Sequence, residues 1–213
     1  MSSKTGAGDS SRCEVLSNVS GAVLVGGKSV RMGRDKQTLG FGGATFTERA
    51  VAAMRQHVEC VVLIGSGSVP TPLAEMLQLP DVPHVAGPMA GVLAAMRRDP
   101  AAAWMVAACD MPEISGDAIL WLLSQRGEDV LAVMPRSREG RVEPLLAVYE
   151  PRARPLLEER AAAGRWGLRH LAGDPRVRCP KPPAELMNAW SDVNTPQELK
   201  ETAKRLYDGA CRA

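Results

Sequence analysis

The chain has 213 residues, a length that fits one α/β domain with a single core. Hydrophobic residues make up 45% and charged residues 23%, which excludes an intrinsically disordered chain. The net charge of +2 argues against a broad surface for nucleic acid or acidic membranes. No stretch reaches the roughly 18 to 20 apolar residues of a membrane span, and residues 1–18 lack the apolar core of a secretory signal.

The cysteines also bear on the cellular compartment. They are widely spaced and form no C-x-x-C pair: Cys13, Cys60, Cys109, Cys179 and Cys211. An odd, dispersed set is typical of reduced intracellular thiols rather than of a disulfide framework or a zinc site. We therefore expect a cytoplasmic protein that binds neither nucleic acid nor membranes.

The predicted elements alternate between short apolar strands and helices. Strands are expected, in chain order, at 19–25, 60–64, 103–108, 129–134 and 145–149. Helices are expected at 45–57, where Thr45 and Glu48 form a capping box, and at 89–98, 115–125, 151–163 and 196–206. This alternation predicts an α/β fold, a Rossmann-like three-layer sandwich with a mostly parallel sheet and helices on both faces.

The domain organisation follows from the same pass along the chain. Residues 1–18 are expected to form a flexible leader, 19–207 a single domain and 208–213 a short tail. In sheets of this kind, ligands bind beyond the carboxyl ends of the strands. The segments 26–36, 65–67 and 109–112 follow three such ends and are the candidate site.

The loop after the first strand is the most informative segment, and it reads LVGGKSVRMGRDK from Leu24 to Lys36. Glycines after a strand let backbone N–H groups approach an anion, and four cations follow, Lys28, Arg31, Arg34 and Lys36. This combination suits a triphosphate. The alternative is a solvated glycine-rich turn. Neither G-x-x-x-x-G-K-[ST] nor G-x-G-x-x-G is present to explain the loop.

Residues 26–36 resemble the G-G-x-S-x-R-M-G-x-D-K signature of molybdenum cofactor guanylyltransferases, at all eight specified positions. The resemblance implies a fold of the nucleotide-diphospho-sugar transferase type. It implies that the guanine nucleotide lies against the backbone of Leu24, Val25, Gly26 and Gly27, and that Lys36 contacts the triphosphate. Arg31 would help Lys36 to offset the charge of the leaving pyrophosphate. The family usually has Ala in place of Val25.

Asp110 directly follows the third strand. A carboxylate there suits Mg²⁺ that bridges nucleotide phosphates, but Asp110 could instead cap the helix that starts after Pro112. The segment 109–112 resembles the family motif C-D-x-P, whose Asp binds the metal. The resemblance therefore favours a magnesium ligand, and Cys109 is interpreted as core packing.

Two further loops resemble the nucleotide side of the family. Residues 87–91 resemble the turn G-P-L-A-G, which leads into a helix, and Asp81 occupies the place of a nucleotide-contacting Asp six residues before it. Asp81 could also be a simple turn residue beside Pro80. Family members often have an Asn near the end of the second strand, and Ser66 is the candidate to replace it.

The acceptor side is expected in the second half of the chain. Residues 192–196 resemble N-V-N-T-P, which makes Asn194 a candidate contact to the pterin-bearing substrate, although Asp192 replaces the first Asn and Thr195-Pro196 also suits a helix start. Residues 141–149 resemble the acceptor-side strand, and Arg141 is a weaker candidate. His57, His84 and His170 show no catalytic or metal-binding spacing.

The expected reaction is transfer of GMP from GTP to the terminal phosphate of Mo-molybdopterin, with Mg²⁺ bound and pyrophosphate released. Three alternatives stay open: a CTP-dependent molybdopterin cytidylyltransferase, a sugar-phosphate nucleotidylyltransferase, and a non-catalytic module that binds nucleotide or delivers the cofactor. The cytidylyl family usually has A-A-G where this chain has Val25-Gly26-Gly27, and G-D-x-P at 109–112. Transient contact with molybdoenzyme clients or cofactor chaperones is expected.

Overall fold

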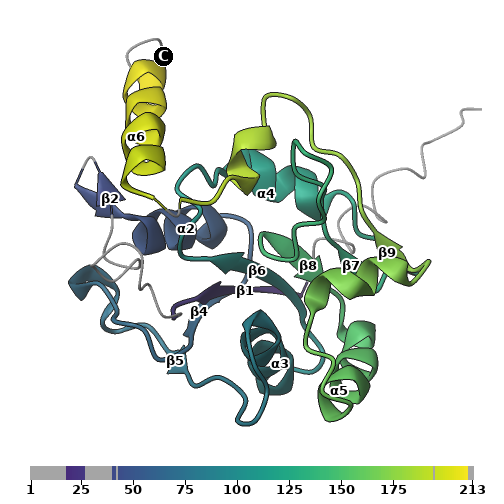
Figure 1. Cartoon of the computed structure of the whole chain (residues 1–213). Helices are drawn as coiled ribbons and strands as arrows, with labels where there is room; N and C mark the ends of the chain where they lie inside the picture. Colours follow the sequence, from purple (N-terminus) through teal and green to yellow (C-terminus); the bar gives the residue numbers. More distant parts are fainter. Residues whose placement is uncertain (1–17, 27–39, 42, 194, 211–213) are drawn as a thin grey trace, which may run out of the picture.

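The structure is a computed structural model that describes residues 18–26, 40, 41, 43–193 and 195–210. It has three layers: a central twisted sheet with helices on both faces (Figure 1). The helices α2 (Phe46–Arg55) and α4 (Gly116–Leu123) cover one face, and α3 (Pro88–Arg98) and α5 (Arg154–Ala162) cover the other. The predicted three-layer α/β fold is therefore confirmed.

The described part of the chain forms a seven-stranded sheet in the order β5-β4-β1-β6-β8-β7-β9. Its strands are β1 (Val19–Leu24), β4 (Val61–Ile64), β5 (Gln78–Leu79), β6 (Ala103–Ala108), β7 (Ala132–Val133), β8 (Ala147–Tyr149) and β9 (Val177–Arg178). Only β8 runs antiparallel, against both β6 and β7. The start of β8 therefore lies at the edge of the sheet where the parallel strands end.

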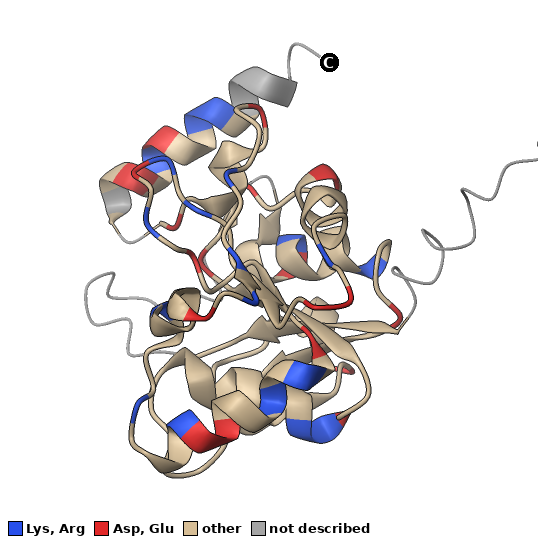
Figure 2. Cartoon of the chain, turned by 90° about the vertical axis from the view of Figure 1, so that its right-hand side faces the viewer, with Lys and Arg blue, Asp and Glu red and all other residues tan. Residues whose placement is uncertain are grey.

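Alternation along the central strands explains why helices cover both faces. In β6, Met105 and Ala107 belong to the core under α2 and α4, whereas Trp104 and Val106 belong to the core under α3 and α5. All four side chains are buried, as expected for a strand between two helical layers. Charged residues lie mainly on helices and loops, and the sheet between them carries few (Figure 2).

Helix starts agree with the sequence patterns. Thr45 and Glu48 form the predicted capping box at α2, with the Glu48 amide donating to Thr45 Oγ1 over 3.2 Å. Thr195 and Glu198 form the same arrangement before α6 (Pro196–Ala210), which continues past the predicted end at 206. In the described part of the chain, no helix is long and apolar enough to cross a membrane.

Some element boundaries differ from prediction. The strand expected at 145–149 begins only at Ala147, because Leu146 has a φ of +53°, which breaks an extended strand. The helix expected at 151–163 begins with a 3₁₀ turn, Pro151–Ala153, and Pro155 stands at the start of α5. Four short strands were not predicted: β5, β9, and the hairpin of β2 (Gly40–Phe41) and β3 (Ala44–Thr45).

Candidate active site

A cavity of about 430 Å³ lies at the carboxyl ends of β1, β4 and β6. We call it the glycine-turn cavity, and its lining includes Leu24, Val25, Gly26, Asp81, Gly87, Pro88, Asp110 and Leu145. The predicted juxtaposition is therefore present: the turn after β1 and the carboxylate after β6 face one cavity. Gly27, Arg31 and Lys36 lie outside the described residues, as does Asn194.

Backbone hydrogen bonds fix the turn after β1. The N–H of Val25 donates to the Ile64 carbonyl over 2.7 Å, and the Val25 carbonyl accepts from the Gly67 amide over 3.0 Å. Val25 can therefore offer a ligand only the second lone pair of its carbonyl oxygen, and the free backbone amides of this turn must come from Gly26 onward.

The turn after β4 packs closely enough against β1 to require glycine. A Cβ on Gly65 would stand 2.2 Å from the Val25 carbonyl oxygen, and Gly65 has a φ of +118°. The Gln78 side chain donates to the carbonyls of Gly65 and Gly67 over 2.9 and 3.1 Å and so holds the turn in place. Ser66 is exposed beside Gly26 and is not among the described residues that line the cavity.

Asp81 lines the same cavity. Its carboxylate oxygens lie 3.6 and 3.4 Å from the positions that Cβ atoms would take on Gly65 and Gly91, so the carboxylate lies close to both backbones. Partial burial raises the pKa of Asp81 above its usual value. Gly87 and Pro88 begin α3 beside it, so the positive end of a helix dipole also borders the cavity.

Asp110 follows β6 directly and is half-buried. It does not cap α4, because the N-cap is Ser115, whose hydroxyl accepts from the Ala118 amide. The Asp110 carbonyl accepts from the Val193 amide over 3.0 Å, which brings the segment around Asp192 next to β6. Cys109 is buried in the core, as predicted.

A second cavity of about 450 Å³ adjoins the first, and both are lined by Pro88, Ala108, Asp110 and Leu145. We call it the tryptophan cavity. Its other walls are largely apolar, and they include Met111, Pro144, Trp166, Leu168 and Trp190. Its polar lining includes Glu143, Arg169, His170 and Asp192. Asp110 therefore stands where the two cavities meet.

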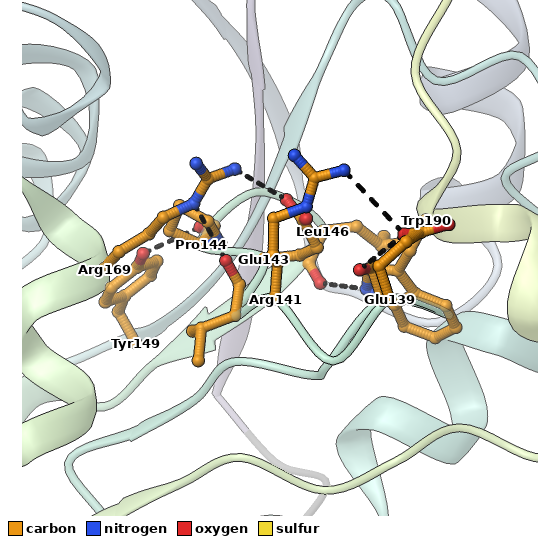
Figure 3. Close-up of polar contacts among 10 residues, drawn as sticks. Glu139, Arg141, Glu143, Pro144, Leu146, Tyr149, Arg169 and Trp190 are labelled. Atoms are coloured by element: carbon orange, nitrogen blue, oxygen red, sulfur yellow. Dashed lines mark hydrogen bonds and ion pairs between the residues drawn. The ribbon is translucent and has the colours of Figure 1, made fainter.

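The segment just before β8 contributes Leu145 to both cavities and Glu143 and Pro144 to the tryptophan cavity. We call residues 142–146 the β8 ledge. Three side chains donate to its alternate carbonyls: Arg169 Nε to Val142 over 2.9 Å, Tyr149 Oη to Pro144 over 2.7 Å, and Trp190 Nε1 to Leu146 over 2.9 Å (Figure 3). These bonds hold the ledge in place despite the positive φ of Leu146.

The pKa shifts of Tyr149 and Glu143 fit the hydrogen bonds of the β8 ledge. Burial raises the pKa of Tyr149, so its hydroxyl stays protonated and remains a donor. Burial also raises the pKa of Glu143, although Arg169 lies 3.2 Å from its carboxylate and opposes the shift. The indole of Trp190 packs edge-on against Trp121, with ring centroids 5.5 Å apart.

A third, polar cavity of about 320 Å³ continues beyond the ledge. We call it the arginine cavity because Arg138, Arg141, Arg169 and Arg205 line it. It shares Glu143, Arg169, Trp190 and Asp192 with the tryptophan cavity. Arg141 is exposed and lies 4.0 Å from Glu139.

The sequence patterns missed Trp166, Arg169, His170 and Trp190 as site residues. They come from the segment after α5 and the 3₁₀ turn Met187–Trp190, where no motif marks them. His170 lines the tryptophan cavity although its spacing suggested no role. His84 does not line any of the three cavities described above, among the described residues.

Comparison with known proteins identifies the family of this chain. The family model of the MobA-like NTP transferase domain matches residues 21–177. A probable molybdenum cofactor guanylyltransferase from Bacillus mycoides is 31% identical over 173 residues, which cover 75% of this chain and 86% of the relative. A Bacillus cytotoxicus protein of the same description is 32% identical over 139 residues, or 63% of this chain and 69% of the relative.

Solved structures share the fold. Molybdopterin-guanine dinucleotide biosynthesis protein A from Archaeoglobus fulgidus superposes with a TM-score of 0.68 at 24% identity, over 89% of this chain and 99% of that one. A 2-C-methyl-D-erythritol 4-phosphate cytidylyltransferase from Thermus thermophilus gives 0.61 at 18% identity, over 87% and 98%. The chain belongs to the MobA-like NTP transferase family and is a nucleotidyltransferase.

Proposed function

We propose that this enzyme transfers GMP from GTP to the terminal phosphate of Mo-molybdopterin and forms the guanine dinucleotide cofactor. A phosphate oxygen of the acceptor attacks the α-phosphorus of GTP, the bond from that phosphorus to the β-phosphate bridging oxygen breaks, and pyrophosphate leaves. The observation that carries the proposal is the pair of adjoining cavities that meet at Asp110. The names of the curated relatives support the choice of substrates.

The glycine-turn cavity suits the nucleotide. Amides from Gly26 onward and the start of α3 would bind phosphates, and Lys36 and Arg31 would offset the charge of the leaving pyrophosphate. Nucleotidyl transfer depends mainly on positioning and charge neutralisation, so no dedicated general base is required.

Asp110 fits a magnesium ion. Among the described residues, no group of three or more His, Cys, Asp or Glu side chains could hold a metal. An ion at Asp110 would therefore need phosphate oxygens as further ligands, which is the coordination that Mg²⁺ prefers at nucleotide sites. When bound there, Mg²⁺ would neutralise part of the triphosphate charge.

Asp81 is the proposed reader of guanine. A carboxylate accepts hydrogen bonds and donates none, and the Watson–Crick edge of guanine offers two neighbouring donor groups, N1–H and the 2-amino group. Cytosine offers a single amino group beside an acceptor nitrogen. The place of Asp81 in the lining of the glycine-turn cavity supports this role.

The tryptophan cavity would receive the acceptor, with Asn194 as a further contact. The hydrogen bond from Val193 to Asp110 supports this, because it brings the chain around Asn194 next to the shared carboxylate. The hydrogen bonds to alternate carbonyls of the β8 ledge would hold the ledge in place and so keep the two substrates correctly positioned at Asp110.

Pyrophosphate release by the purified chain tests the proposal. Release with GTP, Mg²⁺ and molybdopterin, and none when molybdopterin is omitted, is expected. Release with CTP in place of GTP would indicate the cytidylyl activity instead. Binding of GTP without any release in the presence of molybdopterin would indicate a non-catalytic delivery module.

A further inference from the structure

Arg169 occupies the junction of the tryptophan and arginine cavities and lines both. Two contacts fix its guanidinium on the β8 ledge (Figure 3): Nε donates to the Val142 carbonyl over 2.9 Å, and Nη2 donates to the Glu143 carboxylate over 3.2 Å. The side chain is nevertheless 59% exposed. It is therefore positioned in advance without being covered.

The two contacts leave most of the guanidinium available. Arginine carries five N–H groups, and the bonds to Val142 and Glu143 use two of them, so three remain on one planar group. Such a fork matches the spacing of phosphate oxygens, and a lysine ammonium does not reproduce it. Because the anchors have already restricted the rotamers, binding an anion costs less conformational entropy than it would at a free surface arginine.

The charged residues of the tryptophan cavity indicate what Arg169 binds. Its described lining has three carboxylates, Asp110, Glu143 and Asp192, and Arg169 is the one permanent cation among those residues. A phosphorylated substrate would otherwise meet three negative charges there. The apolar walls from Leu145, Trp166 and Trp190 suit the ring of such a substrate, which leaves its phosphate for the arginine.

We propose that Arg169 is the anion-binding residue of the acceptor subsite and receives the phosphate monoester of the acceptor. This inference rests on the proposed function and deepens it. Arg169 orients the acceptor phosphate toward Asp110, which lines the same cavity, and Glu143 is a positioning residue that holds the guanidinium. The nucleotide side does not depend on either residue.

The test compares Arg169→Ala, Arg169→Lys and wild type in two assays. Molybdopterin binding without GTP is followed by quenching of tryptophan fluorescence, and KM for molybdopterin is followed by pyrophosphate release with GTP and Mg²⁺. Loss of a charge-assisted fork is expected to weaken molybdopterin binding by about ten- to a hundredfold in Arg169→Ala. Arg169→Lys is expected to recover only part of this, and Glu143→Gln to lose less than Arg169→Ala.

Arg176→Lys is the matched control, because Arg176 makes an exposed bidentate pair with Asp174 over 3.0 and 2.8 Å and lines none of the three cavities. It should bind molybdopterin as the wild type does. The thermal shift caused by GTP and Mg²⁺ should be the same in every variant, which shows that the fold and the nucleotide side are intact.

Unchanged molybdopterin affinity in both Arg169 variants, with the GTP shift intact, would overturn the inference, as would a wild type that binds no molybdopterin. Failure of the proposed function looks different. In that case, the wild type binds molybdopterin through Arg169 but releases no pyrophosphate from GTP, and the assignment of Arg169 to an anion-binding cavity stands.

Discussion

The glycine-turn cavity and the tryptophan cavity share Asp110, but different kinds of hydrogen bond hold their walls in place. Around the first, backbone bonds between neighbouring strands fix the turns, such as the Val25 amide with Ile64. Around the second, side chains hold the carbonyls of the β8 ledge, namely Tyr149 from nearby in the chain and Arg169 and Trp190 from distant segments. The ends of parallel strands supply the proposed nucleotide side, and the segment that leads into β8, the antiparallel strand of the seven-stranded sheet, borders the proposed acceptor side.

The kind of hydrogen bond that holds each wall determines which substitutions the wall tolerates. A wall of backbone tolerates side-chain changes as long as the close approach of the strands is preserved. A wall held by side-chain donors depends on each donor, because a carbonyl that loses its donor stays removed from water without a hydrogen bond, which destabilises the fold. Variants on the two sides should therefore separate effects on GTP from effects on the acceptor.

Asp110→Asn should have the largest effect, because Asp110 serves both cavities. Loss of one transition-state contact of this kind typically lowers kcat by about 10²- to 10³-fold. Pyrophosphate release at saturating GTP and molybdopterin measures the loss, and circular dichroism checks the fold. Near-normal Mg²⁺-dependent turnover of the variant would show that Asp110 is not a ligand of the metal.

Gly65→Ala tests the backbone wall. The new Cβ would overlap the Val25 carbonyl at a φ of +118°, so we expect a loss of about 3 kcal/mol in the free energy of unfolding. Gly140→Ala is the control, since Gly140 has a φ of +78° in open space, and its loss should be about 1 kcal/mol. Urea denaturation measures both values, and equal losses would contradict the close approach.

Trp190→Phe tests the side-chain wall. It removes the donor to the Leu146 carbonyl, which should cost about 1–3 kcal/mol of stability and raise KM for molybdopterin while the affinity for GTP stays the same. Trp104→Phe makes the same chemical change at the opposite edge of the sheet, where the indole donates to the Asp99 carbonyl over 3.1 Å. It should lose stability without any change in KM.

Asp81→Asn should have the smallest effect. The variant replaces one acceptor oxygen with a donor, so GTP binding should weaken by about tenfold and the preference over CTP should shrink. Isothermal titration with each nucleotide and Mg²⁺ measures this. An unchanged ratio of the two affinities would assign the reading of guanine to other groups.

The described parts of the glycine-turn cavity could be placed together from the sequence, because each part is contiguous. The turn after β1, the carboxylate after β6 and the Gly87-Pro88 turn each follow one strand or start one helix, and parallel strands bring such segments to a common edge. The layers of the sandwich followed from the alternation of strands and helices for the same reason.

Only part of the tryptophan cavity, the proposed acceptor side, follows from sequence patterns: the segments 141–149 and 192–196 are expected there and line it in part. The tryptophan cavity combines residues near 88, 110, 143, 166 and 190, and its key bonds join Trp190 to Leu146 and Arg169 to Val142 across long sequence separations. Leu146 reads as an ordinary strand residue, and only the tertiary contacts explain its positive φ. Neither periodicity nor motif spacing carries that information.

Thermal denaturation of the wild-type chain with GTP or CTP, each with and without Mg²⁺, tests the central claim most directly. A ligand at one hundred times its Kd adds about 2.7 kcal/mol of stability, which corresponds to a rise of about 5–10 °C in Tm for a chain of this size. We predict that GTP gives this rise, that Mg²⁺ enlarges it, and that CTP gives less. A Tm that no nucleotide changes, or that Mg²⁺ leaves unaffected, would contradict a triphosphate site between the glycine turn and Asp110.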